Sequence, residues 1–170
     1  MKNFELKAKC KDHKAALAAV KLLNADYEGI LKQRDVYFKI SPGRLKLRSI
    51  NNSVHQLIYY KRANRAGAKF SNYFIEDIHH PEIVEKILRE IYGIRTIVSK
   101  SRKLYLWQNV RIHIDSVNKL GKFIEFEIVC RTRKQENESA EKMKYLKGIF
   151  NINKVNVLRS SYSDMMMNKI

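Results

Sequence analysis

Proline, cysteine and glycine are all scarce in this sequence. Its 170 residues include two prolines, two cysteines and six glycines. So little proline, together with nine tyrosines, seven phenylalanines and one tryptophan, excludes a disordered basic tail and predicts a folded chain with a sizeable core. The cysteines, Cys10 and Cys130, are too far apart for a zinc site and too few for a disulfide framework. We expect both to be buried thiols in a reducing compartment.

The sequence also lacks a long apolar run. No stretch approaches the ~18 apolar residues of a membrane-spanning helix. Residues 1–14 carry too many charges for a signal peptide. These two absences predict a cytoplasmic protein with no membrane partner.

Acidic residues are few relative to basic ones. The chain has 34 Lys and Arg residues against 17 Asp and Glu residues, which gives a formal net charge of +17. Such an excess indicates an anionic partner, whether a nucleic acid, an acidic membrane surface or a phosphate-rich small molecule.

One stretch, residues 111–127, departs from this basic character. It is typical of two strands joined by a short glycine-containing turn, and side chains on a strand alternate between its two faces. One face of this hairpin is therefore apolar. The other carries an arginine, a histidine and three carboxylates: Arg111, His113, Asp115, Glu125 and Glu127. His113 on this face is a candidate contact for a phosphate or a carboxylate.

The same alternation recurs along the chain and predicts the fold class. We expect further strands over 3–9, 33–40, 44–50, 55–62 and 69–78, and one or two over 94–107. Helices are expected after Asp12, over 81–92, over 139–150 with Ser139 as N-cap, and in the tail over 160–170. About eight strands in a meander, with inserted helices, predict an α+β domain over residues 1–170. A closed antiparallel β-barrel would hide the sheet edges.

The charged faces indicate that this barrel is inverted. The helices need an apolar surface to pack against, so the apolar faces of the strands would point outward and the charged faces inward. The interior would then be a hydrated tunnel lined by both signs of charge. Lys and Arg neutralise phosphate oxygens, and carboxylates hold Mg²⁺ or Mn²⁺, which bridges protein to phosphate. The alternative is that each charged face is a wet outer surface with weak ion pairs, and the pattern alone leaves both open.

These residues resemble the CYTH family, which groups class IV adenylyl cyclases with thiamine triphosphatases and inorganic triphosphatases. The resemblance covers nearly the whole length. Seven short motifs carry it in the family's order: Glu5-Leu6-Lys7, Gln33–Phe38, Gly43–Arg48, Leu57–Arg62, Val98–Arg102, the hairpin over 111–127, and Ser161-Tyr162-Ser163-Asp164. The last of these is similar to the cyclase-like branch.

The resemblance implies a tunnel with helices outside, and it assigns roles by position. The residues expected to bind a triphosphate are Lys7, Arg48, Arg62, Lys100 and Arg102, with Lys9, Lys46, Lys61 and Arg111 as weaker candidates. Of these, the expected catalytic residues are Lys7, Arg48, Lys100 and Arg102. The expected ligands of Mg²⁺ or Mn²⁺ are Glu5, Asp115, Glu125 and Glu127.

One position departs from the family pattern. The first glutamate of the N-terminal motif is Asn3 here, and a neutral amide is a weaker cation ligand than a carboxylate. This change would weaken one metal site, alter the metal preference, or reduce catalysis to binding.

The leading functional hypothesis is a metal-dependent triphosphatase acting on tripolyphosphate, thiamine triphosphate or ATP, as a monomer or homodimer. If the ribose 3′-hydroxyl of ATP attacks in place of water, the same tunnel makes cyclic AMP and pyrophosphate, as an adenylyl cyclase does. A third alternative, less favoured, is a nucleotide- or RNA-binding module with weak catalysis. The net charge and Asn3 would support that alternative.

Overall fold

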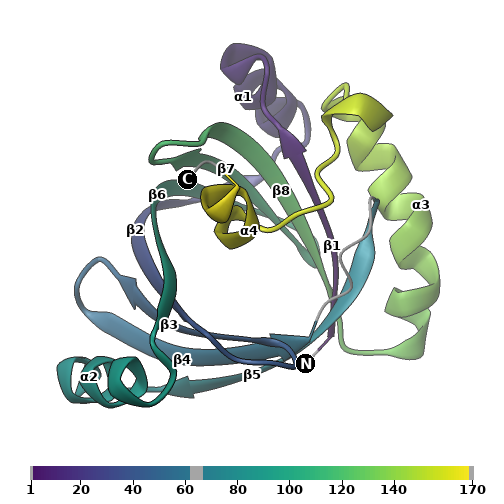
Figure 1. Cartoon of the computed structure of the whole chain (residues 1–170). Helices are drawn as coiled ribbons and strands as arrows, with labels where there is room; N and C mark the ends of the chain where they lie inside the picture. Colours follow the sequence, from purple (N-terminus) through teal and green to yellow (C-terminus); the bar gives the residue numbers. More distant parts are fainter. Residues whose placement is uncertain (1, 62–66, 169–170) are drawn as a thin grey trace.

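Eight antiparallel strands close into a barrel in the computed structural model, which describes residues 2–61 and 67–168 (Figure 1). The strand order around the barrel is β1-β5-β4-β3-β2-β6-β7-β8. The strands are β1 (Lys2–Lys9), β2 (Asp26–Phe38), β3 (Arg44–Ile50), β4 (Val54–Lys61), β5 (Lys69–Asp77), β6 (Ile94–Trp107), β7 (Val110–Val117) and β8 (Gly121–Cys130). The predicted α+β barrel is therefore confirmed.

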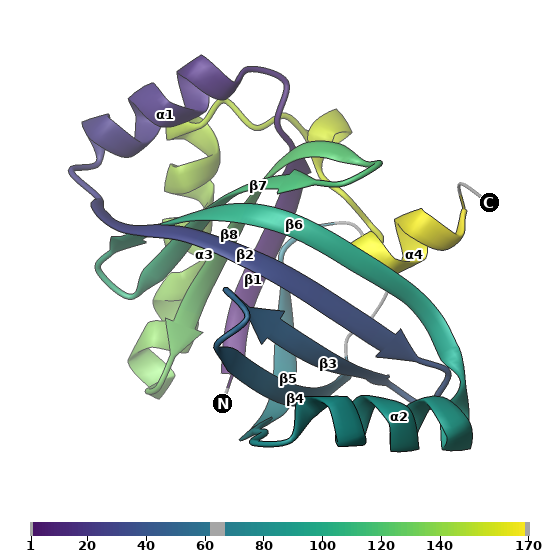
Figure 2. The same cartoon turned by 90° about the vertical axis from the view of Figure 1, so that its left-hand side faces the viewer.

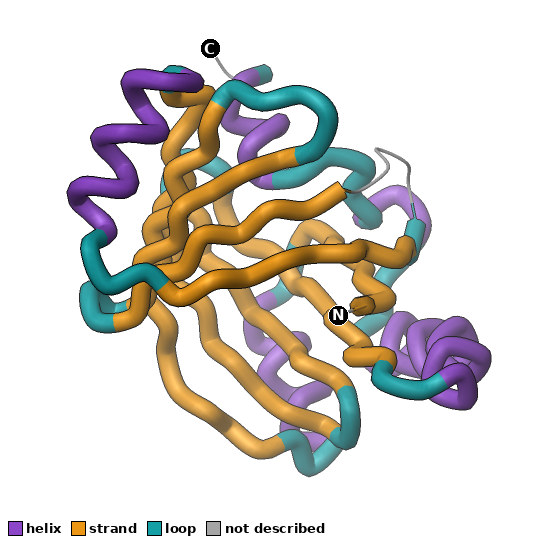
Figure 3. The backbone as a smooth tube through the Cα atoms, turned by 90° about the horizontal axis from the view of Figure 1, so that it is seen from below, coloured by secondary structure: helices purple, strands orange, loops and turns teal. Residues whose placement is uncertain are grey.

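The helices lie outside the barrel (Figures 1 and 3). They are α1 (His13–Leu22), α2 (Pro81–Tyr92), α3 (Arg133–Ile149) and α4 (Tyr162–Met167), with a short 3₁₀ helix at Lys154–Asn156. No helix in the described ranges is long and apolar enough to cross a membrane.

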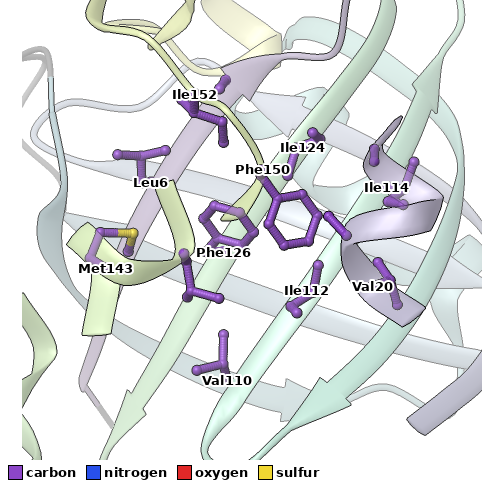
Figure 4. Packing of buried hydrophobic residues seen from close by; sticks show 14 of the residues in the cluster. Leu6, Val20, Val110, Ile112, Ile114, Ile124, Phe126, Met143, Phe150 and Ile152 are labelled. Carbon is purple, nitrogen blue, oxygen red and sulfur yellow. The ribbon is translucent and has the colours of Figure 1, made fainter. Parts of the chain in front are cut away.

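The main hydrophobic core lies between the outer face of the barrel and helices α1 and α3 (Figure 4). Leu6, Ile112 and Phe126 point outward from β1, β7 and β8 and meet Val20 of α1 and Met143 of α3. Burying a side chain of this size stabilises the fold by about 1.5–3 kcal/mol. The outward direction of these apolar residues is what turns the charged faces of the same strands inward.

Helix α2 covers a second part of the outer face, beneath β2 and β3 (Figure 2). Val36, Phe38 and Leu47 are buried there against Val84 and Leu88 of the helix. Helix α2 spans the predicted residues 81–92, with Pro81 at its first position and Gly93 as its C-cap.

One strand prediction needs correction, and one open alternative is decided. Strand β2 begins at Asp26, seven residues before the predicted start at residue 33. The added residues carry no clean alternation, and they are in the sheet because β2 pairs with β6 along most of its length, from Asp26 with Leu106 to Phe38 with Ile94. The one or two strands expected over 94–107 are a single long strand, β6.

The predicted start of the third helix was wrong. Helix α3 begins at Arg133, and Thr132 caps it by accepting a hydrogen bond from the amide of Gln135. The Gln135 side chain accepts from the Thr132 amide in return, which completes a capping box. Ser139 is instead 2% exposed within the helix, where its hydroxyl donates to the Glu136 carbonyl at 2.6 Å. The charged residues before it form the exposed first turns of the helix.

We expect Thr132→Ala to lower the free energy of unfolding by about 1 kcal/mol, because it removes the N-cap of α3. Ser139→Ala should cost less, since alanine favours the helix interior and the Glu136 carbonyl stays inside the helix. Urea unfolding followed by circular dichroism measures both. A larger loss for Ser139→Ala than for Thr132→Ala would contradict this assignment of the cap.

Candidate active site in the barrel tunnel

The barrel interior holds one pocket that brings most of the predicted site residues together. Of the predicted cations, those that line it are Lys7, Lys46, Arg48, Lys100, Arg102 and Arg111. Of the predicted metal ligands, Glu5, Glu125 and Glu127 line it as well. Apolar and aromatic side chains from β2, β4 and β5 complete the wall: Tyr37, Ile58, Tyr60, Tyr73 and Ile75. Residues from all eight strands and the first turn of α4 therefore converge on one interior space.

Strands β2 and β3 supply a buried cation pair held by one acid. Arg48 donates two hydrogen bonds to Asp35, at 2.7 and 2.8 Å, and Lys46 donates a third at 3.0 Å. The pairing of Asp35 with Arg48 follows directly from the β2–β3 register. Both cations are thus fixed on the tunnel wall before any ligand binds.

Strands β6, β7 and β8 build a second network around Arg102. Its guanidinium donates to both oxygens of Asp115 at 2.7 Å and to Glu125 at 2.6 Å. Glu125 also pairs with Lys7 at 3.0 Å. Asp115 is 1% exposed, and Lys100 lies 3.6 Å from it. Arg102 is therefore clamped between two carboxylates deep in the barrel.

The third group surrounds Glu127 at the end of β8. Arg111 lies 3.5 Å from Glu127, and His113 Nδ1 lies 3.5 Å from Glu125 and 4.0 Å from Glu127. Burial, reinforced by Arg102, lowers the pKa of His113 below its usual value. The imidazole is therefore neutral near pH 7 and contacts carboxylates, the second of the two contacts that the sequence suggested for it.

Not every predicted residue reaches the pocket. Lys9 and Lys61 are exposed at the ends of β1 and β4, away from the lining. Asp115 lies behind the lining, with its oxygens held by Arg102. Arg62 falls outside the described residues.

Burial changes the proton affinities of the tunnel lysines. Burial, with the charge of Arg48 beside it, lowers the pKa of Lys46 to about 8. Burial and the neighbouring Arg102 lower the pKa of Lys100 to about 7. The carboxyl groups behave oppositely: burial alone would raise the pKa of Asp35, but Arg48 and Lys46 hold it well below its usual range. The acids therefore stay ionised, whereas two of the cations titrate close to neutrality.

The charges within the tunnel nearly cancel. Among the described residues, six cations and four carboxylates line the pocket, and Asp115 adds a further carboxylate directly behind it. The chain's net charge of +17 therefore lies almost entirely outside the tunnel. An anionic ligand in the tunnel would replace the protein's own carboxylates as the ion-pair partner of the cations.

The acidic side of the pocket fits a divalent cation. Ligand atoms of His113, Glu125 and Glu127 lie within 4.8 Å of one another. Asn3 lines the same pocket, is 5% exposed, and its Oδ1 has no hydrogen-bond partner among the described residues. Carboxylate and amide oxygens are ligands that Mg²⁺ and similar hard cations take. The donor set thus suits a metal ion, and the departure at Asn3 leaves a buried oxygen facing the site.

Two interior residues that hold the charged networks together were missed from the sequence. Asp35 shares the face of β2 with Gln33 and Tyr37, so the same alternation that identified Lys46 and Arg48 could have placed it in the tunnel. Tyr162, in the first turn of α4, is 3% exposed and lines the pocket. No strand pattern could find Tyr162, because it enters the tunnel from a helix.

Comparisons with known proteins agree with this geometry. The family model of the CYTH domain matches residues 1–162. The PH1012 protein of Pyrococcus horikoshii superposes with a TM-score of 0.82 at 23% identity, covering 95% of this chain and 98% of that one. A candidate adenylate cyclase from Vibrio parahaemolyticus has a TM-score of 0.81 at 19% identity, with 97% of each chain covered. Among curated proteins no match was found.

A plant protein is a more distant structural neighbour. HpAC1 of Hippeastrum, a candidate adenylyl cyclase reported to have a dominant triphosphatase activity, has a TM-score of 0.61 at 15% identity. The superposition covers 98% of this chain and 95% of that one. At such low identities these neighbours establish a shared fold.

We expect tripolyphosphate binding to take up protons near pH 8, because a polyanion favours the charged form of Lys46, whose pKa in the free protein is about 8. Affinity should therefore fall as the pH rises through this value. Calorimetric titrations in two buffers of different ionisation enthalpy measure the uptake. Lys46→Arg should remove this contribution, since its guanidinium stays charged, and the difference between the two proteins cancels the ligand's own titration. Equal proton uptake by both would contradict the prediction.

Proposed function

Because the chain belongs to the CYTH domain family, we propose that it is a metal-dependent triphosphatase that binds a triphosphate in its tunnel and hydrolyses it. The observation that carries this proposal is that cations and carboxylates line one pocket together. Cations from β1, β3 and β6 line it, and so do carboxylates of β1 and β8. Catalysis of phosphoryl transfer depends mainly on positioning and on charge stabilisation, which is what such a lining supplies.

The cations would bind the phosphate chain from the two strands that flank β2. Arg48 and Lys46 project from β3, and Arg102 and Lys100 from β6, with Lys7 nearby on β1. Arginine binds phosphate oxygens in a bidentate manner, whereas lysine acts as a point charge. As the bond to the leaving phosphate breaks, these groups would stabilise the negative charge that develops on its oxygens.

The acids would hold the metal. Glu5, Glu125 and Glu127 are the proposed ligands of Mg²⁺ or Mn²⁺, and the amide oxygen of Asn3 is an added donor from the same pocket. When bound, the metal would neutralise phosphate charge and link the substrate to the acidic wall. Asp115 was also expected among the ligands, but, unlike Glu125, it lies behind the pocket lining, where both of its oxygens accept hydrogen bonds from Arg102. We therefore propose that it fixes Arg102.

The competing reaction is adenylyl cyclisation, which would use the same residues. The two reactions differ in which oxygen lies in line with the leaving group, water or the ribose 3′-hydroxyl. We prefer hydrolysis because water is always available as a nucleophile, whereas cyclisation requires the ribose 3′-hydroxyl to be held in line with the leaving group. The reported triphosphatase activity of the Hippeastrum neighbour indicates that a related tunnel can support hydrolysis. The Vibrio neighbour, a candidate adenylate cyclase, is the reason to test cyclisation as well.

A product assay separates these reactions. Purified protein is incubated with tripolyphosphate, thiamine triphosphate or ATP and either Mg²⁺ or Mn²⁺, and the products are separated by chromatography. We expect release of orthophosphate, and none without metal. Cyclic AMP and pyrophosphate from ATP would identify a cyclase. Tight triphosphate binding without any product would favour the binding module. Binding of RNA that weakens steeply with salt would point the same way.

We expect Glu127→Gln to reduce turnover by at least about 100-fold, because it removes a charged metal ligand without removing volume. The loss should be partly offset by higher metal concentration. Glu76→Gln is the matched control, since Glu76 is exposed at the end of β5 and does not line the pocket. Full activity of Glu127→Gln at limiting metal would refute the metal assignment.

A further inference from the structure

Helix α4 places one aromatic side chain inside the tunnel. The helix lies across one mouth of the barrel (Figure 1). Its first residue, Tyr162, is 3% exposed, and its hydroxyl donates a hydrogen bond to Asp115 Oδ2 at 2.9 Å. The tyrosine thus reaches the second network of the site from outside the sheet.

The hydrogen bond from Tyr162 acts on the carboxylate that orients Arg102. Asp115 Oδ2 accepts both from the Tyr162 hydroxyl and from Arg102, at 2.9 and 2.7 Å. The other oxygen of Asp115 accepts from Arg102 Nε at 2.7 Å. A carboxylate that is free to rotate would not hold a guanidinium at one angle. The hydroxyl gives Asp115 a third hydrogen bond, so it also limits the positions open to Arg102.

The ring of Tyr162 contacts the lysines of the same site. Lys7 Nζ lies 3.8 Å from the ring centroid, and Lys100 Nζ lies 5.2 Å from it. A cation over an aromatic face is attracted by about 0.5–2 kcal/mol, with the larger values in desolvated sites. Phe123 supports the ring from behind, with 5.0 Å between centroids. One side chain therefore touches or acts on three of the cations proposed to bind phosphate.

Two further contacts fix α4 to the barrel. The Ser161 hydroxyl accepts a hydrogen bond from the Asp164 amide, and the Asp164 carboxylate accepts from the Ser161 amide in return. The same carboxylate accepts from Arg44 of β3 at 2.8 Å and from Arg95 of β6 at 3.0 Å. Asp164 thereby ties the helix to the starts of two strands that carry the phosphate-binding cations.

We propose that Tyr162 is a positioning residue that sets the geometry of Arg102, Lys7 and Lys100, with α4 serving to deliver it. The inference rests on the proposed triphosphate site and adds a residue that acts through others. The CYTH model match ends at residue 162, so the rest of α4, including Asp164, lies beyond it. Binding and turnover then depend on the docking of this short helix.

A purely structural role for Tyr162 is the competing explanation, because its ring packs in a small cluster with Tyr37, Val98, Val117 and Phe123. Tyr162→Phe separates the two. It keeps the ring, the packing and the contacts with both lysines, and it removes only the hydroxyl. Tyr162→Leu removes the ring contacts as well.

With tripolyphosphate as the probe, we expect Tyr162→Phe to lower kcat by about 10- to 100-fold with little change in KM, because a displaced Arg102 fails mainly in the transition state. Its thermal unfolding midpoint should stay close to that of the unmodified protein. Tyr162→Leu should also weaken tripolyphosphate binding, measured by calorimetry without metal, by about 10-fold. Asp164→Asn should lower both kcat and the affinity for tripolyphosphate.

The matched control is Tyr59→Phe, which removes a tyrosine hydroxyl that donates to the Pro42 carbonyl at 3.1 Å outside the pocket. It should leave kcat and affinity unchanged. Unchanged kcat in Tyr162→Phe, or losses that merely follow a fall in the unfolding midpoint, would overturn the proposal. If the unmodified protein binds tripolyphosphate but turns over no triphosphate, the proposed hydrolysis fails. The affinity of Tyr162→Leu for tripolyphosphate then still tests the proposal, because an unchanged affinity would overturn the role of the ring.

Discussion

The rest of the structure depends on the clamp of Arg102 between Asp115 and Glu125. A buried ion is tolerated only when well-oriented ion pairs and hydrogen bonds offset the hydration free energy that it loses on leaving water. Three adjacent strands, β6, β7 and β8, must keep one register for this clamp to form, because Asp115 lies opposite Arg102 and Glu125 lies one strand further on. The Asp35 clamp on Arg48 makes the same demand on β2 and β3. Shifting either pair by one residue would turn a charged face into the outer core.

These clamps explain why the hydrophobic core is outside the barrel. A strand that places Glu125 inward must place Ile124 and Phe126 outward, and those side chains are buried only because α1 and α3 cover them. The helices are therefore as necessary to the tunnel as its lining. Tyr162 is the exception, since it is a helical residue that lies on the tunnel side and joins the clamp.

The sequence predicts well which residues line the tunnel, but it predicts poorly which acid pairs with which base. Alternation has a period of two residues and is local, so Lys46, Arg48 and Glu125 could be assigned to the inner face directly. Which acid holds which base depends on strand register, and register is not local. The pairing of Asp115 with Arg102 could therefore not be foreseen, and Asp35 was overlooked. The wrong cap at Ser139 has a similar origin, because Ser139 and Thr132 are both acceptable N-caps and the tertiary position of the helix decides between them.

The ion pairs within the tunnel also change the interpretation of the positive net charge. The positive excess suggested that basic side chains in the site are unpaired until an anion binds. In the structure, each strong cation there already forms an ion pair with a carboxylate. A triphosphate bound in the tunnel would compete with Asp35 and Glu125 for Arg48 and Arg102. A metal on the acidic wall would ease that competition, since it offers the displaced carboxylates a new cation. Substrate and metal would then bind more tightly together than separately, because each satisfies the partners that the other sets free.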